Sequence, residues 1–319
     1  MILVTGGSGF VGRALVRRLL AEGYPVRVLA RHSERARPLI EEGAEFVAGD
    51  VTRPQTLRGA TQSAEAVIHL VAIIRERGDQ TLDGVIHQGT RNILAEARSA
   101  GVRRFIFQSA LGTIPEPRYP YIWAKWQAEQ AVQQSGLDWT ILRPSIIFGE
   151  GDEFLRKLAF LVRNVVQASF LPLEAKPSPW QTLTSWGRWV PILPIAGRGQ
   201  IKFQPIWVED VARCHLHCLR NPQTEGRIIP IGGPDQLGYE EMIDLLIRAY
   251  GLRRLKVHVP LAAMKPLVGV LEMIVPHFPV TRQQLDLMAI DNTTDLDAVS
   301  KVFGFTPASL GEKLDYLVV

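Results

Sequence analysis

The stretch PYIWAKWQAEQ, residues 120–130, contains a tyrosine and a lysine four positions apart. In a helix this spacing brings Tyr121 and Lys125 onto one face, one turn apart. A tyrosine hydroxyl has a pKa of about 10, so it needs a nearby positive charge before it exchanges its proton readily near neutral pH. The pair is therefore a candidate for proton transfer, with contact to a cofactor and ordinary helix packing as alternatives.

A second candidate site is TGGSGFVG, directly after the first apolar run of the chain. Its glycines satisfy two phosphate-binding spacings, G-x-G-x-x-G and G-x-x-G-x-x-G. Glycines permit a tight turn and the close approach of the backbone to a pyrophosphate, which then meets free amides at a helix N-terminus. We expect a dinucleotide to bind here, in contact with Gly6, Ser8, Gly9, Phe10, Val11 and Gly12.

The residues at the end of the second predicted strand should determine whether NAD(H) or NADP(H) binds. An acidic residue at this place favours NAD. This chain instead has Arg31, His32 and Arg35. A guanidinium binds a 2′-phosphate with two hydrogen bonds, so we expect NADP(H), with NAD(H) as the alternative. The other interpretation of these residues is a solvated helix start.

The remaining cofactor candidates follow other predicted strands; they are Asp50, Val51, Leu70, Val71, Ala72, Ser109 and Pro144. Asp50 either contacts the adenine amino group or caps the next helix. Residues 69–72 run along the cofactor or simply end a buried strand. The fixed φ of Pro144 should shape the wall at the nicotinamide, and we expect the neighbouring Arg143 to be structural.

Strand and helix patterns alternate from ILVTG at the N-terminus to LDWTILRPS. This alternation predicts an α/β fold, a Rossmann-type doubly wound parallel sheet with helices on both faces. Ligands in such folds bind beyond the carboxyl ends of the strands. We expect the nucleotide-binding domain to span residues 1–148 and 203–231. A smaller, mostly C-terminal substrate domain should span 149–202 and 232–319.

The composition narrows the class of protein. A chain of 319 residues with 46% hydrophobic content can bury a large core. Its net charge of +4 comes from scattered basic residues, so we expect no nucleic-acid partner. The N-terminus MILVTGGSGF lacks the pattern of a secretory signal, which predicts a cytoplasmic protein. No apolar run is long enough to span a bilayer, and peripheral contact with the inner face of a membrane stays open.

The two cysteines, Cys214 and Cys218, lie in ARCHLHCLR. Helical spacing places both on one apolar face, so we expect them to pack in the core. A metal site that also used His215 or His217 would need side chains that point in different directions. We therefore expect no metal.

Taken together, TGGSGFVG, GDVT, the Tyr121–Lys125 pair and LRPSIIFG resemble the extended and atypical short-chain dehydrogenases/reductases, the group of the NAD-dependent epimerases and dehydratases. More narrowly, GTRNILAEARSAGVRRFIFQSALG, GLDWTILRPSIIFG and FQPIWVEDVA resemble the atypical branch that contains the nucleotide-binding accessory subunit of respiratory complex I and its bacterial relatives. The resemblance extends over nearly the whole chain.

The resemblance implies roles for individual residues. Tyr121 would be the general acid or base, and Lys125 would contact the nicotinamide ribose and lower the tyrosine pKa. A serine or threonine should orient the substrate, but Ala110 stands at that position, with Ser109 beside it and Thr113 nearby. Losing one oriented donor costs on the order of a hundredfold in rate.

Two functions follow from these residues. The first is an oxidoreductase that transfers hydride between NADP(H) and a small carbonyl, hydroxyl or enone substrate, including quinone-like molecules. The second is a non-catalytic accessory, assembly or redox-sensing protein at an electron-transport membrane. The tryptophan- and proline-rich segment 167–194 is expected to be a lid, a contact for a membrane or protein partner, or a part folded onto its own domain. The substrate and the oligomeric state have no signature in the sequence.

Overall fold

The computed structural model describes residues 1–163, 192–197, 201–260, 262, 266 and 292–318. The predicted partner segment 167–194 lies outside the described residues except at its end, 192–194. The chain forms two compact units. Unit 1 comprises Met1–Gly149, Gln204–Asp235 and Asn292–Leu310, and unit 2 comprises Glu150–Phe203, Gln236–Asp291 and Gly311–Val319.

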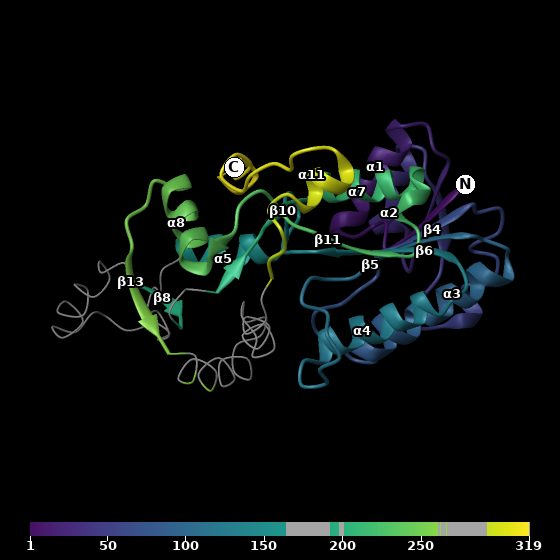
Figure 1. Cartoon of the computed structure of the whole chain (residues 1–319), viewed down its shortest axis with the longest axis horizontal. Helices are drawn as coiled ribbons and strands as arrows, with labels where there is room; N and C mark the ends of the chain where they lie inside the picture. The colour runs from purple at the N-terminus through teal and green to yellow at the C-terminus, as the bar shows by residue number, and fades with distance from the viewer. Residues whose placement is uncertain (164–191, 198–200, 261, 263–265, 267–291, 319) are drawn as a thin grey trace, which may run out of the picture. The chain divides into compact units, whose positions relative to one another are not determined.

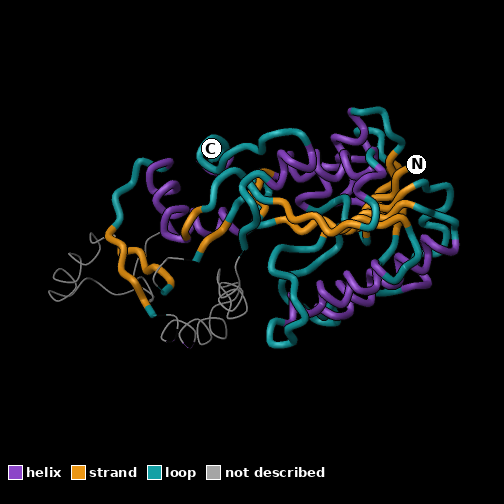
Figure 2. Tube along the Cα trace, viewed as in Figure 1, coloured by secondary structure: helices purple, strands orange, loops and turns teal. Residues whose placement is uncertain are grey.

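Unit 1 contains a seven-stranded parallel sheet, which confirms the predicted Rossmann-type α/β fold (Figures 1 and 2). The strand order is β11-β6-β5-β4-β1-β2-β3, and its direction of growth reverses between β1 and β4. The strands are β1 (Ile2–Thr5), β2 (Val26–Ala30), β3 (Glu45–Ala48), β4 (Ala66–His69), β5 (Arg104–Gln108), β6 (Asp138–Pro144) and β11 (Arg227–Ile231).

Helices cover both faces of this sheet (Figure 1). One face carries α1 (Phe10–Ala21), α2 (Ser33–Glu41), α7 (Val208–Arg220) and α11 (Ala298–Phe303). The other carries a π-helix (Asp83–Gln88) that continues into α3 (Gly89–Ser99), together with α4 (Pro120–Gln133).

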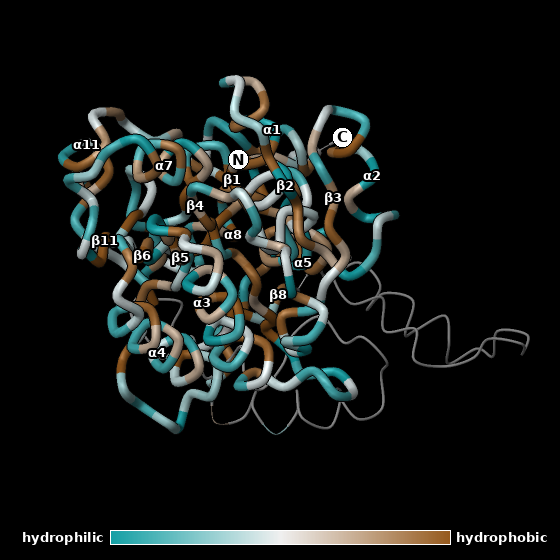
Figure 3. The backbone as a smooth tube through the Cα atoms, turned by 90° about the vertical axis from the view of Figure 1, so that its right-hand side faces the viewer, coloured by the Kyte–Doolittle hydropathy of each residue, from teal (hydrophilic) through white to brown (hydrophobic). Residues whose placement is uncertain are grey.

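Alternation along the strands builds the two apolar layers of unit 1. Leu3 packs toward α3 and α4, whereas Val4 packs toward α1 and α7. In β5, Phe105 and Phe107 face the first layer and Ile106 the second. A strand buried on both faces needs apolar residues at nearly every position, and Figure 3 shows strands β1 and β2 as mostly hydrophobic. This is why these runs were recognisable in the sequence.

The segment Asn292–Leu310 belongs to unit 1, whereas the sequence-based division placed it in the second domain. Asn292 Oδ1 accepts from Ile146 N over 3.0 Å, and Gln204 Oε1 accepts from Thr294 N over 2.7 Å. These partly buried amide contacts return the chain to the end of β6. Such long-range hydrogen bonds leave no periodic pattern, so this return could not be predicted from the residues.

The described residues of unit 2 include the helices α5 and α8, which pack together, and two small sheets. Strands β8 and β13 pair in parallel, and β9 and β12 pair antiparallel. Among the helices of the described residues, none combines the length and the apolar character that crossing a bilayer requires. The remaining elements are β7 (Ile147–Phe148) and β10 (Ile206–Trp207) of unit 1, and α5 (Phe154–Arg163), β8 (Ile192–Ala196), β9 (Lys202–Phe203), β12 (Leu237–Gly238), α8 (Tyr239–Ala249), β13 (Leu255–Val259) and α12 (Asp315–Val318) of unit 2.

Candidate functional site

The predicted phosphate loop forms a tight turn between β1 and α1. Gly6 has a φ of +75°, and Gly9 N donates to Gly6 O over 2.9 Å. A Cβ on Gly12 would lie 2.2 Å from Gly6 O, so only glycine lets the helix approach the turn this closely. Arg13 N donates to Gly9 O over 3.0 Å. The backbone amides between Gly9 and Arg13 therefore lie before the first hydrogen bond of the helix. They have no partner within the helix and can bind a phosphate.

The loop after β4 lies against this glycine turn. Leu70 N donates to Thr5 O over 3.1 Å, and a Cβ on Gly6 would lie 3.2 Å from Val71 N. The strand order reverses between β1 and β4, and ligands of open α/β sheets bind at such a switch point. The structure thus brings Leu70 and Val71 next to the glycine loop, with Ala72 exposed beside them.

Arg31, His32 and Arg35 follow β2, the other neighbour of β1, and their side chains are exposed. His32 is the N-cap residue of α2 and its side chain makes no capping hydrogen bond. A phosphate on the adenosine ribose would meet these side chains if the adenosine lies over the end of β2, as it does in Rossmann folds. The three residues therefore stay candidates for the 2′-phosphate site.

Asp50 makes a local turn after β3. Its Oδ1 accepts from Thr52 N over 2.9 Å and from Thr52 Oγ1 over 2.8 Å. The N-cap of the following 3-10 helix, Pro54–Thr56, is Arg53, so Asp50 does not occupy the capping position. Val51 is buried and its carbonyl accepts from Asn92 Nδ2 over 2.8 Å.

Tyr121 and Lys125 lie on the first turns of α4, which begins at Pro120. Lys125 is only 2% exposed, and its Nζ donates to the backbone oxygen of Gln108 over 2.7 Å. The same amine lies 4.9 Å from the centre of the Phe107 ring. Lys125 is therefore held against the carboxyl end of β5, inside the edge of the sheet where the glycine loop also lies.

Burial shifts both members of the pair away from their charged forms. It lowers the pKa of Lys125 to about 7, and the negative charge of Glu129 acts in the opposite direction. Burial also raises the pKa of Tyr121 to about 12. Tyr121 is thus a neutral phenol at neutral pH, and burial makes it a weaker acid than an exposed tyrosine. A positive charge on a bound nicotinamide would ease the loss of the phenol proton.

The turn after β5 contains the hydroxyl groups that were candidates to replace the missing serine. Thr113 Oγ1 donates to Ala110 O over 2.7 Å, and Ser109 Oγ lies 3.3 Å from Thr113 Oγ1. Because the Thr113 hydroxyl already donates its proton to Ala110 O, Thr113 Oγ1 can only accept from the Ser109 hydroxyl. Pro144 is buried across from this turn, and its carbonyl accepts from Leu111 N. Both hydroxyl protons therefore stay within the turn.

His69 is a fully buried polar residue of β4 whose individual role the sequence did not reveal. Its Nδ1 lies 2.5 Å from Thr5 Oγ1 and its Nε2 lies 3.1 Å from Thr90 Oγ1. Thr90 itself donates to Ile86 O, so His69 carries its proton on Nε2 and accepts from Thr5 on Nδ1. Burial, and then the charge of Lys125, lower the pKa of His69 to about 3. In the sequence, the one feature that could have drawn attention to His69 is the presence of a histidine inside an apolar strand.

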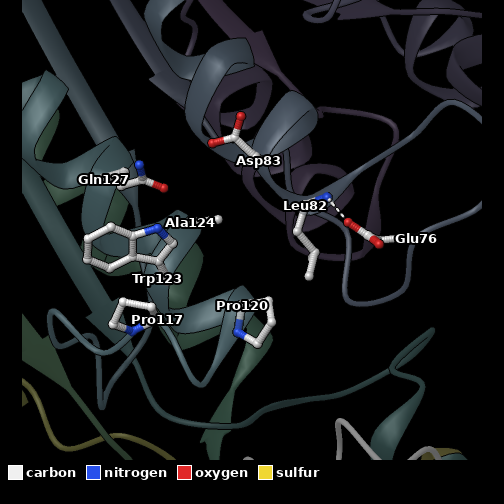
Figure 4. A pocket seen from close by; sticks show the side chains of 8 residues that line it. All are labelled: Glu76, Leu82, Asp83, Pro117, Pro120, Trp123, Ala124 and Gln127. Carbon is white, nitrogen blue, oxygen red and sulfur yellow. Dashed lines mark hydrogen bonds between the residues drawn. The ribbon is translucent and has the colours of Figure 1, made fainter.

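A pocket of about 270 Å³ lies on another face of α4 (Figure 4). Trp123, Ala124 and Gln127 of α4 form one wall, and the start of the π-helix forms the other. Helical geometry turns this face away from the face of Tyr121 and Lys125. Among the described residues, no predicted site residue lines it.

Cys214 and Cys218 are both buried in the core of unit 1. Burial raises the pKa of each thiol, to about 12 for Cys218, so both are held protonated. In the part of the chain that the structure describes, no group of three or more His, Cys, Asp or Glu side chains is placed to hold a metal ion.

The parallel sheet, the switch point and the glycine turn define a nucleotide-binding protein of the Rossmann class. Residues 6–156 match a family model described as NAD(P)H-binding. The chain is also 26% identical to the photosystem II assembly factor Ycf39 of Synechocystis, over 99% of this chain and 89% of that protein. Both similarities support a place among the extended short-chain dehydrogenases/reductases, the family that the sequence resembles.

A further relative and a solved structure are also similar to the chain. The NAD(P)H azoreductase of Xenophilus azovorans is 27% identical, over 79% of this chain and 74% of that protein. The solved dTDP-glucose 4,6-dehydratase of Streptomyces venezuelae has the same fold, with a TM-score of 0.71, 21% identity and coverage of 99% of this chain and 95% of that chain. The narrower resemblance to the complex I accessory subunit stays a prediction.

Proposed function

We propose that this protein is an oxidoreductase that transfers hydride between NADP(H) and a small carbonyl, hydroxyl or enone substrate, with quinone-like molecules among the candidates. The observation that carries the proposal is the placement of Lys125. Its amine is buried against the carboxyl end of β5, one helical turn from Tyr121, at the same edge of the sheet as the glycine loop. This arrangement serves a proton-transfer pair beside a dinucleotide.

In the proposed site each residue has one task. The amides at the start of α1 bind the pyrophosphate, with Gly6 and Gly12 giving them access. Arg31 binds the 2′-phosphate, assisted by Arg35. Lys125 would contact the nicotinamide ribose, and Tyr121 would give its proton to the substrate oxygen. The cofactor, when bound, would supply the hydride. The relative whose name describes an NAD(P)H azoreductase supports reductive chemistry.

The decisive experiment titrates the purified protein with NADPH and NADH and then follows cofactor oxidation with quinones, enones and small carbonyls. We expect turnover with at least one of these classes. In Tyr121→Phe the turnover should fall about 100- to 10,000-fold while NADPH affinity stays within about threefold, because only the proton donor is removed. Equal turnover in Tyr121→Phe would refute the proton-transfer role.

A second candidate function is that of a nucleotide-binding assembly or accessory protein without turnover. Two observations favour it. Ala110 stands where the family has an orienting hydroxyl, and the relative aligned over almost the whole chain is described as a photosystem II assembly factor. In this case NADPH would co-purify tightly and resist oxidation by every substrate class. Capture of a membrane or protein partner through segment 167–194 would belong to this candidate.

A further inference from the structure

A buried ion pair lies one helical turn beyond Lys125. Glu129 of α4 has no exposed surface. Its Oε1 accepts from Arg143 Nε over 2.8 Å, and its Oε2 accepts from a terminal nitrogen of Arg143 over 2.5 Å. Arg143 comes from β6 and its side chain is 25% exposed. The carboxylate is therefore oriented by two parallel hydrogen bonds.

Stability by itself does not account for this pair. Taking an ion out of water costs several kcal/mol, and apolar residues of similar volume often replace buried ion pairs without loss of stability. The neighbouring buried positions of α4, Ala128 and Val132, are apolar. A carboxylate at position 129 therefore indicates that its negative charge has a role other than stability, such as an effect on a neighbouring charged group.

The group that can use this charge is Lys125, one turn away on the same helix face. The Lys125 amine donates to Gln108 O and lies over the Phe107 ring, and both contacts favour the ammonium form. Burial favours the neutral amine instead. A neutral amine would offer the ribose and the Tyr121 hydroxyl no positive charge. The balance between these opposing influences depends on the carboxylate of Glu129.

We propose that Glu129, oriented by Arg143, is a positioning residue that keeps a larger fraction of Lys125 in its ammonium form near neutral pH. The inference rests on the proposed function only where it assigns a use to that charge. Other ionisable groups lie on α4 itself or on the elements that pack against α4 and β5. They include Tyr121 on α4, the neutral His69 on β4, His215 on α7, which contacts Gln108, and the Asp83–His87 pair of the π-helix, whose side chains contact each other.

The test measures the titration of Lys125 in the whole chain without cofactor. Lysine labelled with 13C at Cε is followed by NMR from pH 5.5 to 10.5, and Lys125→Arg assigns the signal. Glu129→Gln keeps the shape of the side chain and removes its charge. We expect the midpoint of Lys125 to fall by about one pH unit, a tenfold loss of proton affinity. A midpoint within 0.2 units of the wild-type value would overturn the inference.

The chain offers a matched control. Glu153 and Lys157 of α5 form an ion pair at the same spacing over 2.8 Å, and the Glu153 side chain is 81% exposed. Glu153→Gln should move the midpoint of Lys157 by much less, because water screens this pair. If Glu129→Gln does not fold, Glu129→Gln with Arg143→Met removes both charges together. Its reference is Arg143→Met, which keeps the carboxylate: the Lys125 midpoint should be lower in the double variant than in Arg143→Met, and equal midpoints would again contradict the inference.

The same proteins separate this inference from the proposed function. NADPH affinity at pH 7.5 should fall about three- to tenfold in Glu129→Gln if the ammonium of Lys125 contacts the ribose, since a smaller fraction of the amine is charged. A shifted Lys125 midpoint with unchanged NADPH affinity would support the charge coupling and refute the ribose contact. An unchanged midpoint with normal turnover would refute the coupling and leave the oxidoreductase proposal standing.

Discussion

Lys125 donates from Nζ to the backbone oxygen of Gln108 over 2.7 Å, which ties α4 to the carboxyl end of β5. The Gln108 side chain extends this link to the other face of the sheet, because its Oε1 accepts from His215 Nε2 on α7 over 2.9 Å. One residue at the end of a strand thus connects the helix that carries Tyr121 with a helix of the opposite layer. The site is held from both sides of the sheet.

This buried amine should make the stability of the protein depend on pH. The pKa of Lys125 is about 7 in the folded protein and lies near 10.5 when the lysine is exposed. Between these values the unfolded chain binds more protons, so the free energy of unfolding rises with pH. From pH 7 to 8.5 we expect a rise of up to ~1.4 kcal/mol per pH unit, measured by urea unfolding. Lys125→Met should flatten this rise, and an equally steep curve would show that Lys125 is not its source.

The buried histidines should make the protein sensitive to acid. Burial lowers the pKa of both His69 and His215 to about 3. The unfolded chain takes up these protons as the pH falls below about 6.5, whereas the folded protein resists them, so stability is lost in that range. Each histidine contributes up to ~1.4 kcal/mol per pH unit. Thermal unfolding from pH 7 to 4 tests this, with His215→Met expected to halve the slope that the two residues produce.

Glycine substitutions should separate the two ends of the phosphate loop. Gly12→Ala would place a Cβ 2.2 Å from Gly6 O, and the rigid backbone there cannot move aside cheaply. We expect a loss of about 1–3 kcal/mol in stability and of measurable NADPH binding. Gly9→Ala is the control, since its Cβ would lie 3.1 Å from the same oxygen, and its stability should change less. Equal effects in the two variants would mean that close approach is not what Gly12 provides.

Arg31 should determine the preference between the two dinucleotides. Its exposed guanidinium follows β2, where the adenosine ribose is expected. Arg31→Ala should weaken NADPH about 10- to 100-fold, because hydrogen bonds to a charged group are worth ~1.5–3 kcal/mol, and should leave NADH nearly unchanged. Arg35→Ala should also weaken NADPH binding, but by a smaller factor. Fluorescence titration with both cofactors measures the ratio, and an unchanged ratio in Arg31→Ala would refute the 2′-phosphate contact.

Ala110→Ser should restore an orienting hydroxyl to the turn after β5. If the chain turns over substrate, this donor should raise kcat by up to about a hundredfold. The same change in a Tyr121→Phe background should give no gain, because the hydroxyl only positions a substrate whose proton comes from Tyr121. A gain that persists without Tyr121 would assign proton transfer to the new serine.

The sequence by itself determined the central sheet and the nucleotide end of the site. Strands buried on both faces must be apolar along their length, and a turn that brings a backbone against a helix N-terminus must contain glycines at Gly6 and Gly12. The spacing of Tyr121 and Lys125 likewise follows from helix geometry. These features depend on residues that are close together in the chain, so the sequence alone is enough to predict them.

Only the tertiary structure decided how the charges of the site are balanced. Gln108 contacts Lys125, which is 17 positions away in the chain, and His215, which is 107 positions away. Glu129 and Arg143, which also contact each other, are 14 positions apart. The return of Asn292–Leu310 to unit 1 depends on contacts of the same kind. Burial and partner choice are properties of folded neighbours distant along the chain, and no local pattern of residues specifies them.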